Sequence, residues 1–175
     1  VAVPAAPDPE ADRYRRVAAT GEVLPGEVHV YTSVPPYGVG YRVIVPFALG
    51  DGRTVLLDRG FVGIEAKEAA RLTGALRVEG ALDWPRETDG ATPEPDREAN
   101  IWFARDVGLM AEALGTAPVL IVTEASDDAD QPLPLPVSVD VPNNHLGYAV
   151  QWYGLAAIWA VMTLLLLWRI KRRTD

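Results

Sequence analysis

Residues 41–62 read YRVIVPFALGDGRTVLLDRGFV. In this stretch, two runs rich in β-branched, aromatic and other apolar residues flank the turn signal Gly50-Asp51-Gly52. Runs of this kind on both sides of a Gly/Asp turn predict a β-hairpin, and this is the strongest hairpin signal in the chain. The stretch therefore predicts a domain organised around antiparallel strands.

Further strand-like runs lie on both sides of this hairpin, at residues 13–24, 28–33, 76–84, 101–104 and 119–124. A short helix is predicted over residues 106–114, because Asp106 can cap its first turn and Gly115 can close its last. Residues 64–72 predict one or two helical turns, and the polar, proline-containing residues 85–100 predict an exposed connection. We expect a mainly β fold with minor α content (α+β), a small antiparallel β barrel or sandwich.

Residues 143–173, NNHLGYAVQWYGLAAIWAVMTLLLLWRIKRR, have a different character, because the 23 residues from 146 to 168 carry no charged side chain. As an α-helix, this run would extend about 34 Å, enough to cross a hydrocarbon core of roughly 30 Å. A buried helix of a soluble domain would normally hold only about 10–14 consecutive apolar residues. We therefore expect a transmembrane helix over residues 143–169.

The charges beside this helix predict its direction. Four basic residues follow the apolar run, whereas residues 130–145 contain two acids and no Lys or Arg. Basic flanks favour the cytoplasmic side, so residues 170–175 would be a cytoplasmic tail and residues 11–142 an extracytoplasmic domain, with a flexible leader at residues 1–10. The membrane would be the plasma membrane of a bacterium or the mitochondrial inner membrane of a eukaryote. Because no signal sequence precedes the domain, we expect that an N-terminal targeting or transmembrane segment is missing.

Composition excludes several functional classes. Residues 1–145 hold 12 basic and 23 acidic side chains, which argues against nucleic acid or anionic lipid headgroups as ligands of the domain. The absence of Cys excludes disulfides, thiolate catalysis and thiolate metal sites, and two Met residues are too few for a Cu(I) carrier.

Catalytic motifs are also missing from the sequence. There is no nucleophile elbow, phosphate loop or His-Glu-x-x-His pattern, and the chain has only two histidines. We expect His29 to be a surface or hydrogen-bonded strand histidine, and Asp127, Asp128 and Asp130 to belong to a solvated acidic linker. The segment 58–60 is expected to form a barrel-closing turn held by an ion pair. The chain is therefore not expected to be an enzyme.

His145 is the residue for which two interpretations stay open. Aromatic residues follow it at helical offsets of 3, 7 and 14, which places them on its face: Tyr148, Trp152 and Trp159. In one interpretation, His145 caps the helix at the headgroups beside an interfacial aromatic belt. In the other, it is an axial ligand above an aromatic wall for a flat apolar macrocycle, which would explain an aromatic ring as deep as Trp159.

The segment PNNHLGYAVQWYGL, residues 142–155, resembles the C-terminal signature of the SURF1 (Shy1) family. The segment LLDRGFV at residues 56–62, VEG at 78–80 and NIWF at 100–103 are similar to further motifs of that family, and Asp106 also fits its pattern. The similarity covers about residues 13–170. The matching motif positions are Arg59, Gly60, Trp102, Asn143, Asn144 and His145.

The resemblance implies an assembly factor for haem-copper cytochrome c oxidase that binds haem a and assists its insertion into subunit I. The family's helix histidine matches His145, and Tyr148 and Trp152 would be its neighbours at the haem. The implied partners are oxidase subunit I, other oxidase or supercomplex subunits, haem a synthase and membrane lipid, with no nucleic acid. The alternative is a structural accessory subunit stably associated with the oxidase or a respiratory supercomplex.

This chain departs from the family pattern at three points. The family's first transmembrane helix has no counterpart here. Asp58 stands where the family usually has Asn, and Phe61 where it usually has Trp. The additional acid at position 58 could pair with Arg59 and alter a contact surface.

Overall fold

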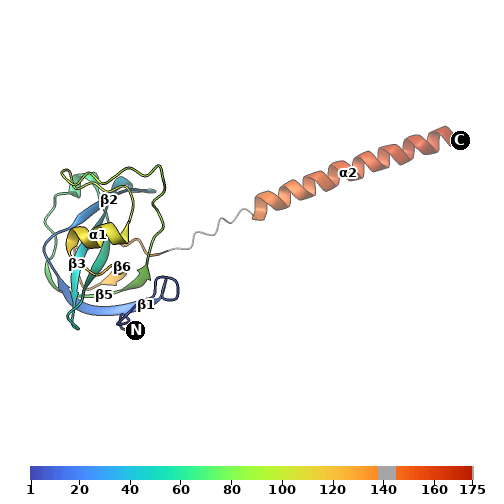
Figure 1. The fold of residues 1–175 in the computed structure, drawn as a ribbon. Coiled ribbons are helices and arrows are strands. Elements are labelled where there is room, and N and C mark those ends of the chain that lie inside the picture. The colour runs from blue at the N-terminus through green and yellow to red at the C-terminus, as the bar shows by residue number, and fades with distance from the viewer. Residues whose placement is uncertain (138–144, 175) are drawn as a thin grey trace. The chain divides into compact units, whose positions relative to one another are not determined.

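The computed structural model describes residues 1–137 and 145–174 (Figure 1). The chain divides into two compact units, Val1–Val137 and Ser138–Asp175. The first is a mainly β unit, and the second consists of a single described helix, so each is considered by itself.

The first unit is built on one sheet of six strands in the order β1-β5-β6-β4-β3-β2. The strands are β1 Arg16–Val23, β2 Val28–Val34, β3 Gly38–Leu49, β4 Thr54–Gly63, β5 Gly74–Asp83 and β6 Leu120–Ser126. The two helical elements of this unit are the 3₁₀ turn η1 Ile64–Ala66 and the helix α1 Val107–Leu114.

The predicted hairpin is confirmed as β3 and β4, which pair antiparallel. The Leu49 amide donates to the Arg53 carbonyl over 2.7 Å, and Gly52 has φ of +88°, a conformation that glycine adopts without steric strain. The local turn signal in residues 50–52 therefore determines where the chain reverses.

The pairing of the remaining strands corrects part of the prediction. β4 and β6 run parallel, with Leu56 opposite Leu120, so the sheet is not wholly antiparallel. The long connection between them allows this, because parallel neighbours need a crossover of about a dozen residues or more. β1 pairs with β5 and also with the end of β3. The mainly β class with minor helix is confirmed, whereas a barrel or sandwich is not.

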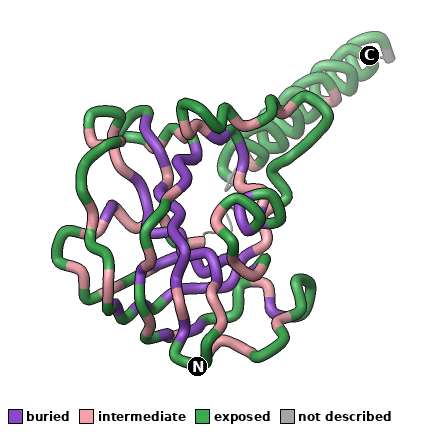
Figure 2. Tube along the Cα trace, turned by 60° about the vertical axis from the view of Figure 1, so that its left-hand side comes forward, coloured by how far each residue is buried: buried purple, intermediate pink, exposed green. Residues whose placement is uncertain are grey.

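Both faces of the central strands are buried. On one face, Val43, Val45 and Phe47 of β3 join a first apolar cluster, while Ile44 of β3 and Leu56 of β4 join a second cluster on the other. Successive side chains of a strand point to opposite faces, so a strand covered on both sides is apolar without interruption. Figure 2 shows the resulting buried residues along the strands.

The predicted helix at residues 106–114 is confirmed as α1. The Asp106 carboxylate accepts a hydrogen bond of 2.9 Å from the Leu109 amide, and Gly115 ends the helix with φ of +65°. The apolar side of α1 packs Val107, Met110 and Ala111 into the second cluster.

One shorter predicted element is confirmed in part and another is wrong. The helical turns expected within residues 64–72 are present as the single turn η1. The strand expected at residues 101–104 is absent, and Ile101 and Trp102 form isolated bridges instead. Trp102 alone pairs with β2: its amide donates to the His29 carbonyl over 2.9 Å, and its carbonyl accepts from the Tyr31 amide over 2.7 Å. The two backbone hydrogen bonds of Trp102 therefore form an isolated bridge, which does not continue into a strand pairing.

Residues at the start of the chain contact the sheet. The Ala18 amide donates to the Val1 carbonyl over 2.8 Å, and the Arg53 guanidinium donates to the Pro4 carbonyl over 2.6 Å. Val3 packs against the first apolar cluster.

The second unit contains α2, His145–Thr174, a helix of 30 residues. Its segment Leu146–Arg173 has a mean hydropathy of 1.8 and is long and apolar enough to cross a membrane. None of its most apolar window is buried, and Figure 2 shows the residues of this helix as largely exposed.

Candidate functional site

Asp58 is a fully buried carboxylate in the middle of the apolar strand β4. Arg42 on β3 donates from Nε to its Oδ2 over 2.7 Å, and the Gly60 amide donates to its Oδ1 over 3.0 Å. A second guanidinium, that of Arg105, lies 3.8 Å from Oδ2. A carboxylate can remain ionised in such a place only when charged and hydrogen-bonding partners compensate its lost hydration.

The second of these guanidiniums is shared with Glu87. Arg105 donates from Nε to Glu87 Oε1 over 3.0 Å, and its backbone amide donates to Oε2 over 3.0 Å. Burial by itself would raise the pKa of Glu87, but the hydrogen bonds and charge of Arg105 outweigh it and leave that pKa lowered. Burial would correspondingly lower the pKa of Arg105, and its bonds to Glu87 raise it.

Arg59 does not pair with Asp58, which corrects the suggestion made from their adjacency. The register between β3 and β4 places Val43 opposite Gly60 and Ile44 opposite Asp58, so Arg59 is the extra residue of a β-bulge. Its guanidinium forms an ion pair with Asp128 and donates to the Leu72 carbonyl over 2.8 Å. Segment 58–60 is thus an ion-paired bulge within β4 instead of a barrel-closing turn.

Asp128 was expected in a solvated linker, and for this residue the prediction is wrong. Its side chain is only 7% exposed, because it is the counter-ion of the buried Arg59. The two residues lie 69 positions apart in the sequence. Asp130 is exposed, as expected of a linker residue.

Gly60 allows residues 131–135, here called the strap, to pair with the end of β4. The Phe61 amide donates to the Leu133 carbonyl over 2.7 Å, and the Leu133 amide donates back to Phe61 over 2.9 Å. Gly60 has φ of +115°, and a Cβ at this position would lie 2.2 Å from the Leu133 carbonyl oxygen. Arg42 fixes the strap at a second point by donating to the Leu135 carbonyl over 3.0 Å.

His29 is a buried histidine whose two ring nitrogens both have partners. Nε2 lies 2.9 Å from Glu27 Oε1, and Nδ1 lies 3.4 Å from the Asn100 amide nitrogen. Arg71 donates to the same oxygen of Glu27 over 2.7 Å. The interpretation of His29 as a hydrogen-bonded strand histidine is confirmed.

Trp102, the remaining motif position of the first unit, is a core residue that is 2% exposed. It belongs to the second apolar cluster with Met110 and Val107 of α1. Arg59, Gly60 and Trp102 therefore lie inside the β unit, and each makes contacts that hold its segments together.

The other motif positions belong to the second unit. Tyr148, Trp152 and Trp159 all lie on α2, with exposed fractions of 62%, 69% and 72%. Their spacing puts them on one face of the helix. Asn143 and Asn144 lie outside the described residues, and so does the side chain of His145, whose backbone begins α2.

The chemistry available differs between the two units. Within residues 1–137 and 145–174, no group of three or more His, Asp or Glu side chains is placed to hold a metal ion. The buried charges described above are compensated by one another, which is the pattern of a structural network. The exposed aromatic face of α2 is the surface suited to a flat apolar molecule or another helix.

Sequence patterns did not identify the partners in this network: Arg42, Arg71, Glu87, Arg105 and Asp128. One signal was present, because Arg42 is a single charge within an apolar strand segment and Asp58 follows three apolar residues in another. A charge in such a segment must be paired if the strand is buried on both faces.

Comparison with known proteins agrees with the family resemblance. The SURF1 family model matches residues 1–157. A SURF1-like protein of Monosiga brevicollis is 34% identical over 171 residues, which cover 85% of this chain and 64% of that protein. A SURF1-like protein of Rickettsia bellii is 26% identical over 180 residues, covering 92% of this chain and 70% of that protein.

Human Surfeit locus protein 1 is 32% identical over 125 residues, which cover 67% of this chain and 42% of the human protein. The chain thus spans less than two thirds of the Monosiga and human proteins. The matched region nevertheless includes the whole β unit and the first part of α2. The chain therefore belongs to the SURF1 family.

Proposed function

We propose that this chain is an assembly factor for haem-copper cytochrome c oxidase. The observation that carries the proposal is the family match over residues 1–157. This match includes both the β unit and the beginning of α2. The assembly role is inferred from the family. The membrane span and the haem site proposed below are assigned from the residues of this chain.

In this proposal, α2 crosses the membrane with its basic end in the cytoplasm. The charge asymmetry supports this direction, because Arg169, Lys171, Arg172 and Arg173 follow the apolar run and residues 130–145 have no Lys or Arg. The β unit would then be extracytoplasmic, in a bacterial plasma membrane or its mitochondrial counterpart. Its partners would be oxidase subunit I and other subunits of the oxidase or a supercomplex.

Haem a would be the cargo, carried against the N-terminal half of α2. Its fit rests on the exposed face of Tyr148, Trp152 and Trp159, because aromatic rings offer flat apolar contacts to a macrocycle. A histidine at position 145 would supply an imidazole nitrogen, a donor that can bind haem iron. The α2 residues would hold the macrocycle and keep it from water until transfer, and the chain itself would not turn over a substrate.

The absorption spectrum of the full chain tests this site. The chain, co-expressed with haem a synthesis and purified in detergent, should show a Soret band that His145→Ala abolishes and Tyr148→Leu weakens. Tyr153→Leu is the matched control. Tyr153 directly follows Trp152, so its side chain points about 100° around the helix axis from the Trp152 side chain. Wild-type protein without haem, or equal losses in the two tyrosine variants, would contradict the proposed site.

The stoichiometry of co-purification separates an assembly factor from an accessory subunit. An assembly factor should leave the mature oxidase and be substoichiometric in the purified enzyme. One copy of the chain per mature oxidase would instead support the accessory-subunit alternative.

A further inference from the structure

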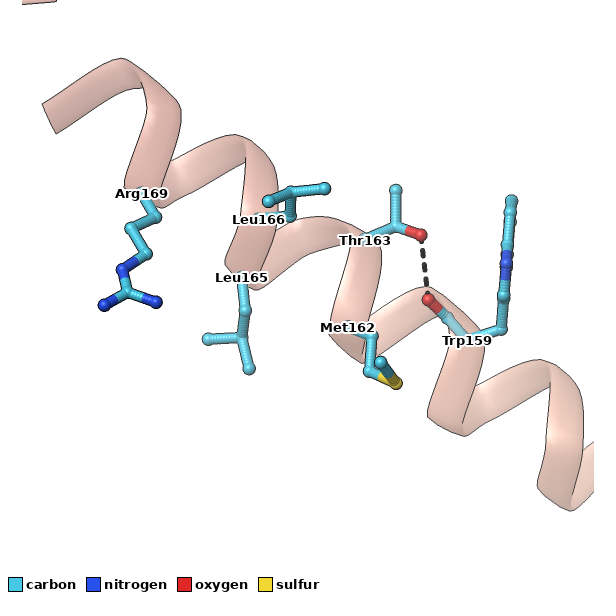
Figure 3. Close-up of a pocket in the computed structure, with 6 residues that line it drawn as sticks. All are labelled: Trp159, Met162, Thr163, Leu165, Leu166 and Arg169. Atoms are coloured by element: carbon cyan, nitrogen blue, oxygen red, sulfur yellow. Dashed lines mark hydrogen bonds between the residues drawn. The ribbon is translucent and has the colours of Figure 1, made fainter. Parts of the chain in front are cut away.

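The β unit contains a pocket of about 270 Å³ whose walls come from four separate segments. These are the end of β1 with the connection to β2, single residues of β3 and β4, and residues 69–73 before β5. Val23 and Val45 in its wall belong to the first apolar cluster, so the pocket reaches the core of the unit. The hollow on α2 in Figure 3, by contrast, is lined by that one exposed helix. The pocket in the β unit is therefore a site that the fold itself builds.

Arg59 is the most buried charged residue in the wall of this pocket, with a side chain that is 3% exposed. A guanidinium has five N–H groups. One of them donates to the Leu72 carbonyl over 2.8 Å, and another donates to Asp128. The remaining three, including Nε–H, have no acceptor among residues 1–137 and 145–174. Nε is nevertheless not sealed from solvent, so the pocket is where its acceptor would lie.

The second guanidinium in the wall, that of Arg71, has no such free capacity on its terminal nitrogens. Their four hydrogens donate to Glu27 and to three backbone carbonyls within residues 66–69. Each arginine also has its own carboxylate, Glu27 for Arg71 and Asp128 for Arg59. Because these charges are balanced, an anion in the pocket would be a buried charge without a counter-ion. The acceptor that suits Arg59 is therefore an uncharged one.

Water alone would fill this pocket poorly. Its volume gives room for several water molecules, but the apolar wall of Val23, Leu24 and Val45 offers them no hydrogen-bond partner. An apolar group that displaces such loosely held waters gains affinity. The volume is also below the roughly 300–1,000 Å³ of pockets for drug-sized ligands, so the occupant must be small.

We propose that this pocket binds a small, uncharged organic molecule through a carbonyl oxygen. The carbonyl would accept from the free N–H groups of Arg59, and the apolar body of the molecule would lie against Val23 and Val45. A ketone or amide carbonyl supplies this acceptor without adding a charge. The site lies wholly within the β unit, so the proposal does not depend on the membrane span, on haem or on the oxidase.

Nuclear magnetic resonance of the full chain in detergent micelles tests this proposal. The valine and leucine methyl groups are labelled, and the chain is titrated with three probes of the same shape. Acetophenone offers a carbonyl, α-methylstyrene has a methylene group in its place, and benzoate has a carboxylate. Acetophenone should shift the methyl signals of Val23, Leu24 and Val45. α-Methylstyrene should bind about tenfold more weakly, because it loses a hydrogen bond to a charged donor. Benzoate should also bind more weakly. The aqueous concentration of each probe is measured, since apolar molecules also enter micelles.

Two variants locate the binding in this pocket. Arg59→Lys keeps the charge beside Asp128 but loses the planar fork of donors, so acetophenone binding should fall to the level of α-methylstyrene. Ala70→Phe places a bulky ring in the wall and should abolish the methyl shifts. Ala91→Phe is the matched control for this second variant, because Ala91 is equally exposed but does not line the pocket.

Equal affinities for acetophenone and α-methylstyrene would overturn the hydrogen bond to Arg59. Tighter binding of benzoate would overturn the uncharged class of ligand in favour of an anion site. Equal losses in Ala70→Phe and Ala91→Phe would overturn the location. If none of the three probes shifts the methyl signals of the pocket, it holds water only and the proposal is wrong.

Discussion

Arg42 and Asp58 form a buried ion pair between β3 and β4, with 2.7 Å between Nε and Oδ2. Their side chains are 13% and 0% exposed. The same guanidinium donates to the Leu135 carbonyl, so this pair also holds the strap that leads out of the β unit. The carboxylate of Asp58 thus accepts from the bulge at Gly60 and pairs with both Arg42 and Arg105.

Replacing Asp58 by Ala should lower the free energy of unfolding by about 3–5 kcal/mol, because Arg42 and Arg105 would keep their buried positions without a counter-ion. Urea unfolding of the full chain in detergent micelles, followed by tryptophan emission, measures this change. Glu79→Ala is the control, because Glu79 is exposed and pairs with an equally exposed Arg77. Similar small effects of the two substitutions would show that the buried pair is not structurally important.

Replacing Gly60 by Ala should destabilise the β unit and release the strap. The positive φ alone costs an L-residue about 1–2 kcal/mol, and the added Cβ would also overlap the Leu133 carbonyl. Gly52→Ala separates these effects, since Gly52 has φ of +88° and open space around a Cβ. Hydrogen exchange should accelerate at Phe61 and Leu133 in the Gly60 variant only. Unchanged protection there would argue against the close contact.

Arg59 and Asp128 should be strongly coupled in a double-mutant cycle. Arg59→Ala and Asp128→Ala should each cost about 3–5 kcal/mol, because each leaves a buried charge unpaired. Removing both should cost clearly less than the two single losses together. Additive unfolding free energies would mean that the ion pair does not form in solution.

Glu87 should make stability depend on pH in acid. Its folded-state pKa is lowered, so its contribution is fully present above the unfolded value of about 4.3 and is lost as the pH falls through the folded value. The free energy of unfolding should fall less steeply below about pH 5 in Glu87→Gln than in the wild type. Identical pH profiles would show that Arg105 does not stabilise the Glu87 carboxylate.

Local patterns predicted much of the fold. The Gly-Asp-Gly turn predicted the hairpin, Asp106 and Gly115 predicted both ends of α1, and the uncharged run from residue 146 predicted α2. Each of these signals lies within the element that it specifies, so one sequence is enough to recognise it.

Pairings between segments far apart in the sequence could not be predicted from these local patterns. The parallel contact of β4 with β6 and the ion pair of Arg59 with Asp128 join segments far apart in the sequence. Neither leaves a periodic signal, and the bulge that turns Arg59 away from Asp58 is a consequence of pairing with β3. The motif positions Arg59, Gly60 and Trp102 were recognised by resemblance, while their contacts became apparent only from the fold.

The haem a content of the oxidase tests the central claim most directly. Oxidase subunit I would be purified from cells that lack this chain, from complemented cells, and from cells carrying the His145→Ala variant. We predict a lowered ratio of haem a to subunit I without the chain, restored by the wild type and not by the variant. A full complement of haem a in the absence of the chain would contradict its role in oxidase assembly.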